Sequence, residues 1–340
     1  MLNRRTAMLA AVGLLPAGRL LAGPAQAQVS ARTLRFTAAS NKGHPQVLGV
    51  ERFAELVESK SSGRIKVRPF PGGSLGPDLQ VVSAMQGGTI DLNVMNASLL
   101  AGNVKEMAAL DLPFLFNTAA EADAVIDGPV GKQLIDKLPA RGLVGLGYWD
   151  LGFRQMHTRA NKPIARADDL KGLKMRVIPT PLYVDLMNAL GANAVPLPFT
   201  ETYTALEQGA IDGMTNPLLN IPDGKYQEVS KHLTLTNHIY TPQVVIASKR
   251  TWDKLSEEER RILQEAAAET TPYQRKVARE QAANVLDELR KAGMTIHELP
   301  PEEVAKLKER AQPVTAKYTK ELGEEFVGEL NAAVQKVRAA

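Results

Sequence analysis

Short runs of apolar or alternating residues recur along most of the chain and predict β-strands. Side chains of a strand point alternately to its two faces, so a run of this kind is buried on one face or on both. The runs are separated by longer stretches with a different spacing. The predicted strands are residues 33–37, 64–70, 90–95, 143–149, 153–158, 175–178, 194–197 and 244–248.

The stretches between these strands have the spacing of amphipathic helices. In residues 45–59, Leu56 and Val57 gather toward one side while Glu51 and Glu55 stay solvated. Alternation of strands and helices indicates an α/β fold with buried sheets. The predicted helices are residues 45–59, 78–86, 119–138, 182–190 and 200–208.

The last part of the chain, from Ser256 onward, is charge-rich and largely helical. Ile262 and Ala266 belong to an apolar series with helical spacing, which Pro272 interrupts. The pattern therefore predicts either one kinked helix or two helices that meet at the proline. Gly293 has the chemistry of a helix C-terminus. A short strand at residues 294–297 and a helical region at residues 302–338 follow.

The first residues are typical of a secretory signal peptide. Arg4 and Arg5 form a positive head, residues 7–17 are apolar, and residues 25–27 read Ala-Gln-Ala. The apolar stretch is too short to span a membrane core of roughly 30 Å, which disfavours a membrane anchor. We expect cleavage before Gln28 and a periplasmic protein. The paired arginines suggest twin-arginine export, although such pairs are also ordinary in a signal peptide.

Charge and cysteine content exclude several classes of protein. Residues 1–27 contain three of the 41 Lys and Arg and none of the 37 acidic residues, which leaves 38 basic residues against 37 acidic ones. No basic stripe for nucleic acid is expected at this balance. The absence of cysteine removes disulfides and thiolate chemistry. The 313 residues left after removal of the leader exceed the usual size of a single core, so we expect two domains.

The sequence contains no motif that predicts catalysis. It has no glycine-rich nucleotide loop, no His-Glu-x-x-His and no Gly-x-Ser-x-Gly. The histidines are scattered, with no pair at metal-ligand spacing on a predicted helix. We therefore expect no enzyme activity, no cofactor and no metal. The histidines are His44, His157, His232, His238 and His297.

Five segments form a specific combination, although any one of them alone would be only suggestive. They are residues 70–76 (FPGGSLG), 112–116 (LPFLF), 148–178, 189–217 and 226–240. Together they resemble the extracytoplasmic solute receptors of tripartite ATP-independent periplasmic (TRAP) transporters, the dicarboxylate-receptor-like family. The resemblance runs from about residue 34 to about residue 290, most of the chain.

The resemblance implies a two-domain, clam-shell binding protein that closes on its ligand. Crossing strands and a long helix that starts near Ser256 would join the domains. Domain I would comprise residues 28–151 and 242–281, and domain II residues 152–241 and 282–340. The cleft between the domains is where such a protein holds its ligand.

Arg176 lies in a predicted strand with apolar neighbours on both sides. Burying its charge unpaired would be expensive, so it needs a partner. Its planar fork suits a carboxylate held by two parallel bonds. A structural ion pair with an acidic residue is the alternative. In the family the arginine of this motif clamps the ligand carboxylate, so the resemblance favours Arg176 as a ligand-binding residue.

The resemblance implies two further ligand contacts. Arg154 matches a second family arginine close to the ligand, and Gly152 beside it allows close backbone approach. Asn216 matches the family asparagine that hydrogen-bonds the ligand. Met214 and Thr215 stand here where the family often has Gln-Glu. This departure concerns residues that would support the ligand-binding side chains rather than contact the ligand.

Three more residues are candidate ligand contacts. Asn96 follows a predicted strand, at a position where some relatives carry an acid. Phe199 belongs to the cleft wall or to the start of a helix. Trp149 is either a platform on which a ligand stacks or a core residue, since aromatic side chains mostly serve burial.

The predicted function is a receptor that captures a small organic-acid anion and delivers it to the membrane permease of a TRAP transporter. Asn96, Asn216, Gln155 and His157 lie in or beside the matched motifs, and amides both donate and accept hydrogen bonds. They favour a sugar acid such as a uronate. A receptor for a C4-dicarboxylate or another monocarboxylate remains open. A binding protein of an ATP-driven importer and a periplasmic enzyme are less favoured.

Overall fold

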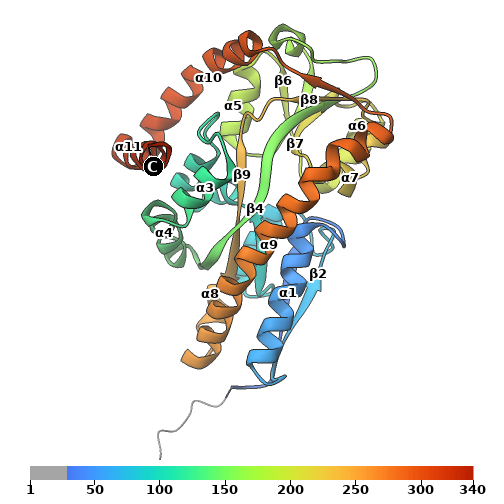
Figure 1. Ribbon diagram of the computed structural model, residues 1–340. Helices are drawn as coiled ribbons and strands as arrows, with labels where there is room; N and C mark the ends of the chain where they lie inside the picture. The colour runs from blue at the N-terminus through green and yellow to red at the C-terminus, as the bar shows by residue number, and fades with distance from the viewer. Residues whose placement is uncertain (1–28, 340) are drawn as a thin grey trace, which may run out of the picture.

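The computed structural model describes residues 29–339. The predicted signal peptide and its cleavage site before Gln28 lie outside these residues. Among the described residues, no helix is long and apolar enough to cross a membrane. Strands and helices alternate along the chain, so the predicted α/β fold class is confirmed (Figure 1).

The strands form two halves of one connected sheet, in the order β2-β1-β3-β9-β4-β7-β5-β6, with β8 beside β4 and β10 beside β8. In one half β1 pairs in parallel with β2 and with β3, and in the other half β5 pairs in parallel with β6 and with β7. The strands are β1 (Arg32–Ala38), β2 (Ile65–Phe70), β3 (Leu92–Asn96), β4 (Leu143–Thr158), β5 (Lys174–Val177), β6 (Asn193–Pro196), β7 (Gly213–Pro217), β8 (His232–Leu235), β9 (Tyr240–Ser248) and β10 (Thr295–Glu298).

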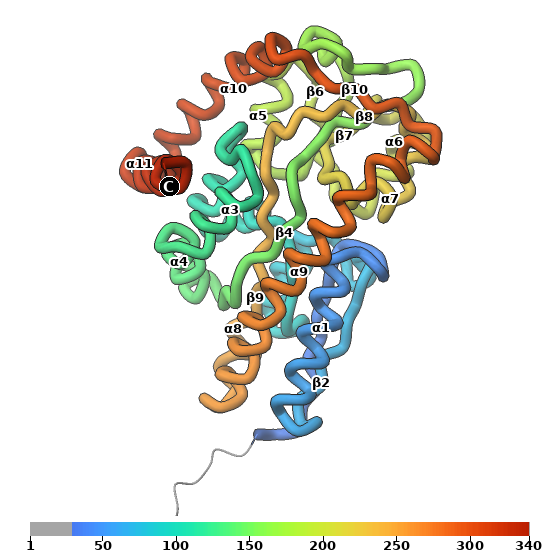
Figure 2. The backbone as a smooth tube through the Cα atoms, viewed as in Figure 1, coloured from blue at the N-terminus to red at the C-terminus, as the bar shows by residue number. Residues whose placement is uncertain are grey.

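Strand β4 joins the two halves. Its first part pairs antiparallel with β9, and its last part pairs with β7 and β8 (Figure 2). The sequence predicted two strands here, residues 143–149 and 153–158, but the structure has one strand with two irregularities. Gly152 lies within the second of them with a φ of +93°, a backbone conformation that glycine adopts without strain. The strand therefore turns from one half to the other without ending.

Two predicted helical regions are each divided. The region 119–138 contains two short helices separated at Gly128 and Pro129, and the region 302–338 divides at Gly323, whose φ is +108°. Strands β7 and β8 were not predicted. The helices are α1 (Pro45–Lys60), α2 (Asp78–Gly87), α3 (Ala119–Ile126), α4 (Pro129–Asp136), α5 (Pro181–Ala189), α6 (Thr202–Glu207), α7 (Asn220–Asp223), α8 (Lys249–Trp252), α9 (Glu257–Lys291), α10 (Pro301–Leu322) and α11 (Glu324–Arg338).

Helix α9 is one continuous helix that runs beside both halves of the molecule (Figure 1). It begins with a reciprocal capping box between Ser256 and Glu259. Of the two predicted alternatives at Pro272, the single helix is correct. Its apolar side packs on the half that contains β1, through residues such as Ile262 and Leu263.

The C-terminal helices pack on both halves. Helix α10 lies against α5, whereas α11 lies against α3, where Phe326 and Val327 share a core with Ala122. Arg338 of α11 forms an ion pair with Glu121 of α3 at 3.0 Å. The division proposed from the sequence placed residues 282–340 wholly in domain II. Helix α11 packs on α3, which belongs to the segment proposed as domain I, and the proposed bounds themselves stay a prediction.

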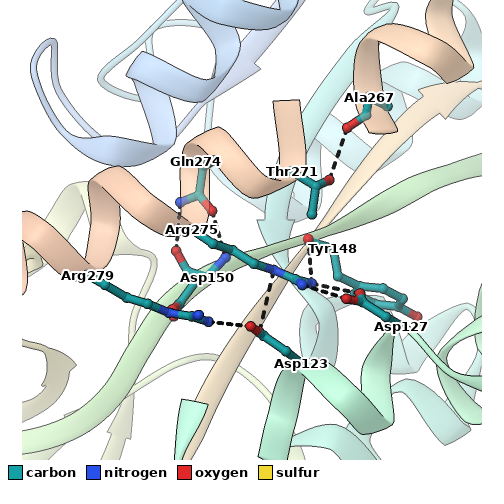
Figure 3. A network of polar contacts seen from close by, with 9 residues as sticks. All are labelled: Asp123, Asp127, Tyr148, Asp150, Ala267, Thr271, Gln274, Arg275 and Arg279. Carbon is teal, nitrogen blue, oxygen red and sulfur yellow. Dashed lines mark hydrogen bonds and ion pairs between the residues drawn. The ribbon is translucent and has the colours of Figure 1, made fainter. Parts of the chain in front are cut away.

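A polar cluster connects α9 to strand β4 at Asp150, two residues before Gly152 (Figure 3). The buried Gln274 side chain donates to the Asp150 carbonyl and accepts from the Asp150 N–H, both at 2.8 Å. Arg279 donates to the Asp150 carboxylate at 2.9 Å and to Asp123 of α3 at 2.7 Å. The cluster therefore holds β4, α3 and α9 together where the chain passes between the halves.

Replacing Gln274 by alanine should lower the free energy of unfolding by about 1–3 kcal/mol, because both backbone groups of Asp150 lose their partner in a buried place. Urea denaturation would measure the loss. Gln281→Ala on the exposed face of the same helix is the matched control and should have little effect. Equal stability of the two variants would contradict this role of Gln274.

Candidate functional site

A cavity lies between the two halves, at the carboxyl ends of parallel strands from each. Ala39 and Ser40 follow β1, Asn96 ends β3, and Ile178 follows β5. Carboxyl ends of parallel strands are where α/β sheets usually hold ligands. The lining comprises Ala39, Ser40, Gln46, Pro77, Asp78, Leu79, Met95, Asn96, Leu99, Leu151, Arg154, Arg176, Ile178, Pro179, Pro198, Phe199, Asn216, Asn220 and Gln243.

Arg176 reaches the cavity from β5, and its side chain is only 2% exposed. Its Nε and one terminal nitrogen donate to the carbonyl of Leu197 at 2.9 and 2.6 Å. Within residues 29–339 it has no carboxylate partner within 4.0 Å, so the alternative of a structural ion pair is not what the structure has. Burial and the nearby charge of Arg154 lower the pKa of Arg176 to about 9.

Arg154 reaches the cavity from β4 and is also buried. Its Nε donates to the Thr215 hydroxyl at 2.9 Å, a terminal nitrogen donates to the Thr215 carbonyl, and its guanidinium lies 5.2 Å from the centre of the Tyr183 ring. Thr215, which stands where the family often has glutamate, thus contributes only neutral acceptors. Burial lowers the pKa of Arg154.

The acid near Arg154, Asp111, is hydrogen-bonded to a neutral group, the Tyr183 hydroxyl, rather than to an arginine. Asp111 is fully buried and accepts from the Tyr183 hydroxyl at 2.7 Å. Burial raises the pKa of Asp111 to about 6, although Arg154 opposes this rise. Two buried cations therefore share one cavity without an ion-pair partner among the described residues. Buried charges are normally paired, so this arrangement calls for an external anion.

Amide side chains surround the arginines with unused hydrogen-bonding atoms. Asn216 of β7 accepts from the Nδ2 of Asn220 at 3.0 Å. The Nδ2 of Asn216, the Oδ1 of Asn220 and the Oε1 of Gln243 are buried and have no partner among the described residues. These residues line the cavity, and their three atoms without a partner comprise one donor and two acceptors.

Of the six predicted site residues, the structure brings five to this cavity: Asn96, Arg154, Arg176, Phe199 and Asn216. Trp149 does not line it. Its side chain is 1% exposed and stacks on Phe36 with the ring centres 6.1 Å apart. A Cβ at Gly49 would approach the indole to 2.9 Å, which shows how closely α1 covers it. Trp149 is therefore a core residue, and its placement at the ligand is corrected.

Gln155 and His157, on which the sugar-acid prediction also relied, do not line the cavity either. They lie two residues apart in β4 and share the face opposite to that of Arg154. Gln155 accepts from the N–H of Thr236 at 2.7 Å, and His157 contacts the Ser230 hydroxyl at 2.8 Å. These contacts connect β4 to the segments that flank β8.

Sequence reasoning missed five polar residues of the cavity: Ser40, Gln46, Asp78, Asn220 and Gln243. Asp78 begins α2 directly after Pro77, a place where an acid is usually only a helix-start residue. Asn220 begins the short helix α7, and Gln243 lies in β9. The sequence offered one sign that Asn220 belongs to the site, its position four residues after Asn216. This spacing can be interpreted only once β7 is known to end at the cavity.

Comparison with known proteins gives the family. Residues 36–321 match the model of the bacterial extracellular solute-binding proteins, family 7. The 2,3-diketo-L-gulonate-binding periplasmic protein of Escherichia coli is 35% identical over 276 residues, which cover 81% of this chain and 84% of that protein. The C4-dicarboxylate-binding periplasmic protein of Rhodobacter capsulatus is 34% identical over 335 residues, 98% of this chain and 99% of that protein.

Solved structures agree. A TRAP periplasmic solute-binding protein from Ochrobactrum anthropi, with a C-terminus bound in its ligand pocket, is 52% identical and has a TM-score of 0.81, covering 91% of this chain and 97% of that one. A sugar-acid-binding protein from Advenella mimigardefordensis in complex with galactonate is 38% identical, with a TM-score of 0.88 over 91% and 99% of the two chains. The chain belongs to the family-7 extracellular solute-binding proteins, and it is a two-domain receptor of the TRAP type rather than an enzyme.

Proposed function

We propose that this receptor binds a sugar acid with a single carboxylate, an aldonate or a uronate, through Arg176 and Arg154. The observation that carries the proposal is the combination, in one cavity, of two buried arginines without an ion-pair partner and amide atoms without a hydrogen-bond partner among residues 29–339. The arginines suit the carboxylate of such a ligand, and the amides suit its hydroxyl groups.

The unsatisfied acceptors favour a hydroxylated ligand over a bare dicarboxylate. Asn220 Oδ1 and Gln243 Oε1 need donor hydrogens, and succinate with both carboxylates ionised has none to offer. Each acceptor left without a partner would cost about 1–3 kcal/mol. A hydroxyl both donates and accepts, so a sugar acid can satisfy these acceptors and also Asn216 Nδ2.

The relatives support both the proposal and its alternative. The galactonate complex and the diketo-gulonate-binding protein concern sugar acids, whereas the Rhodobacter capsulatus relative binds C4-dicarboxylates. The unpaired acceptors of the cavity favour the sugar acid in this proposal. We further propose that the receptor works in the periplasm and delivers its ligand to the membrane permease subunits of a TRAP transporter.

A ligand panel tests the proposal. At about 100 times its Kd a ligand stabilises the folded protein by about 2.7 kcal/mol. We expect galactonate, gluconate, galacturonate or glucuronate to raise the melting temperature and to give a calorimetric Kd, while lactate, benzoate and succinate give little at neutral pH. Tight binding of succinate or benzoate, with no response to any sugar acid, would contradict the proposal.

A further inference from the structure

Three charged side chains line the cavity, and one of them is an acid. Asp78, at the start of α2, faces the cavity from the half that contains β1, whereas Arg176 and Arg154 reach it from β5 and β4. The lining of the described chain therefore carries a net charge of one positive unit when all three groups are ionised. One carboxylate on the ligand balances this charge, and a second would leave the site negative.

The Asp78 carboxylate is not used elsewhere in the described structure. It is half-buried, and within residues 29–339 it has neither an ion pair within 4.0 Å nor a hydrogen-bond donor from the protein. The other elements of its half that reach the cavity present uncharged side chains, such as Ser40, Asn96 and Gln243. Arg176 and Arg154, on the other half, are thus the charged groups that share the cavity with Asp78.

We propose that Asp78 makes the receptor selective for solutes with one carboxylate, and that a solute with two carboxylates binds only together with a proton. The inference rests on the proposed function in taking the arginines as the anchor of the first carboxylate. An ionised Asp78 repels a second carboxylate across the cavity, where charges surrounded by protein interact more strongly than in bulk water. With a sugar acid, the same carboxylate accepts hydrogen bonds from hydroxyl groups.

Protonation of Asp78 is accessible near neutral pH. Burial raises the pKa of Asp78 to about 6, and Arg176 partly opposes the rise. A raised pKa means that the neutral form predominates below about pH 6 and the repelling ionised form above it. The affinity for a dianion should therefore fall by about tenfold for each pH unit above 6, while the affinity for a monoanion should change much less.

The test uses two pairs of ligands that differ only in the second carboxylate: galactonate with galactarate, and butyrate with succinate. Calorimetry at about pH 7.5 and about pH 5.5, in buffers of different ionisation enthalpy, gives the affinity and the number of protons taken up. The wild-type protein is compared with Asp78→Asn. Asp223→Asn is the matched control, because burial also raises the pKa of Asp223 to about 6 although it lies outside the cavity, bonded to Asn41.

We expect the wild-type protein at about pH 7.5 to bind galactonate at least about tenfold more tightly than galactarate, and to take up about one proton with galactarate. Asp78→Asn should abolish the proton uptake and reduce the ratio of the two affinities by about tenfold or more. Asp223→Asn should leave the ratio as in the wild type. Circular dichroism and the melting temperature show whether each variant folds.

The outcomes separate this inference from the proposed function. Galactarate binding as tightly as galactonate at about pH 7.5, without proton uptake, would overturn the role of Asp78 and leave the sugar-acid proposal standing. A third outcome is that neither sugar acid binds, that butyrate binds more tightly than succinate, and that Asp78→Asn loses this preference. It would support the role of Asp78 and refute the sugar-acid proposal. Succinate binding tightly without proton uptake would count against both, as would no binding of any of the four together with no response to galacturonate or glucuronate.

Discussion

Replacing Arg176 by lysine should weaken ligand binding by roughly tenfold to a hundredfold while the protein still folds. The guanidinium of Arg176 donates two hydrogen bonds to the Leu197 carbonyl and still faces the cavity. A lysine has a single compact ammonium group and cannot keep this anchor while holding a carboxylate by two parallel bonds. Losing a charge-assisted hydrogen bond costs about 1.5–3 kcal/mol, which corresponds to the expected loss of affinity.

Titration calorimetry on the folded variant measures this effect, with a sugar acid from the panel as ligand. Arg166→Lys is the matched control, because Arg166 lies in the same half of the molecule with its side chain 71% exposed. It should bind like the wild type. Wild-type affinity of a folded Arg176→Lys variant would show that the ligand carboxylate is held elsewhere in the cavity.

Replacing Trp149 by alanine should lower the free energy of unfolding by about 3–5 kcal/mol and leave the affinity of the folded protein close to that of the wild type. The indole is 1% exposed between Phe36 and α1, so its removal leaves a cavity in the core that the closely packed surroundings fill only partly. The binding site is not expected to change, because Trp149 does not line it.

Urea denaturation and calorimetry together test this prediction. Trp252→Ala provides the comparison, since Trp252 packs against the same core but is only partly buried, and it should cost less stability. A Trp149→Ala variant with near wild-type stability and lost affinity would return Trp149 to the ligand site. Loss of stability alone identifies Trp149 as a core residue, whereas loss of affinity alone identifies it as a platform on which the ligand stacks.

The spacing of apolar residues was enough to predict the fold class and most of its elements. Strand periodicity in residues 33–37 and helical periodicity in residues 45–59 follow from how each backbone presents its side chains, so they can be read without tertiary information. Prolines also act locally on the backbone, but whether a helix ends at a proline depends on tertiary packing. Pro272 stays inside one helix because the packing of α9 on both halves of the molecule outweighs the hydrogen bond that proline removes.

The charged anchors of the site could also be recognised from the sequence. An arginine between apolar neighbours in a short strand must be buried, and a buried arginine needs an anion, so the chemistry of Arg176 is implied by its setting. The sequence left open whether that anion belongs to the protein. Only the structure shows that the acid behind Arg154, Asp111, is bonded to Tyr183 rather than to an arginine.

The remaining members of the site were decided by tertiary structure alone. Periodicity shows that a side chain is buried but not what it is buried against. Trp149 faces a core and Gln243 faces the cavity, although their strands pair with each other in the same sheet. Asp78 has the sequence setting of an ordinary helix start, and it enters the cavity only because the chain brings the start of α2 opposite to the end of β5. Hydrophobic patterning thus determined the elements and the arginine chemistry, whereas contacts between residues far apart in the chain determined which polar groups meet the ligand.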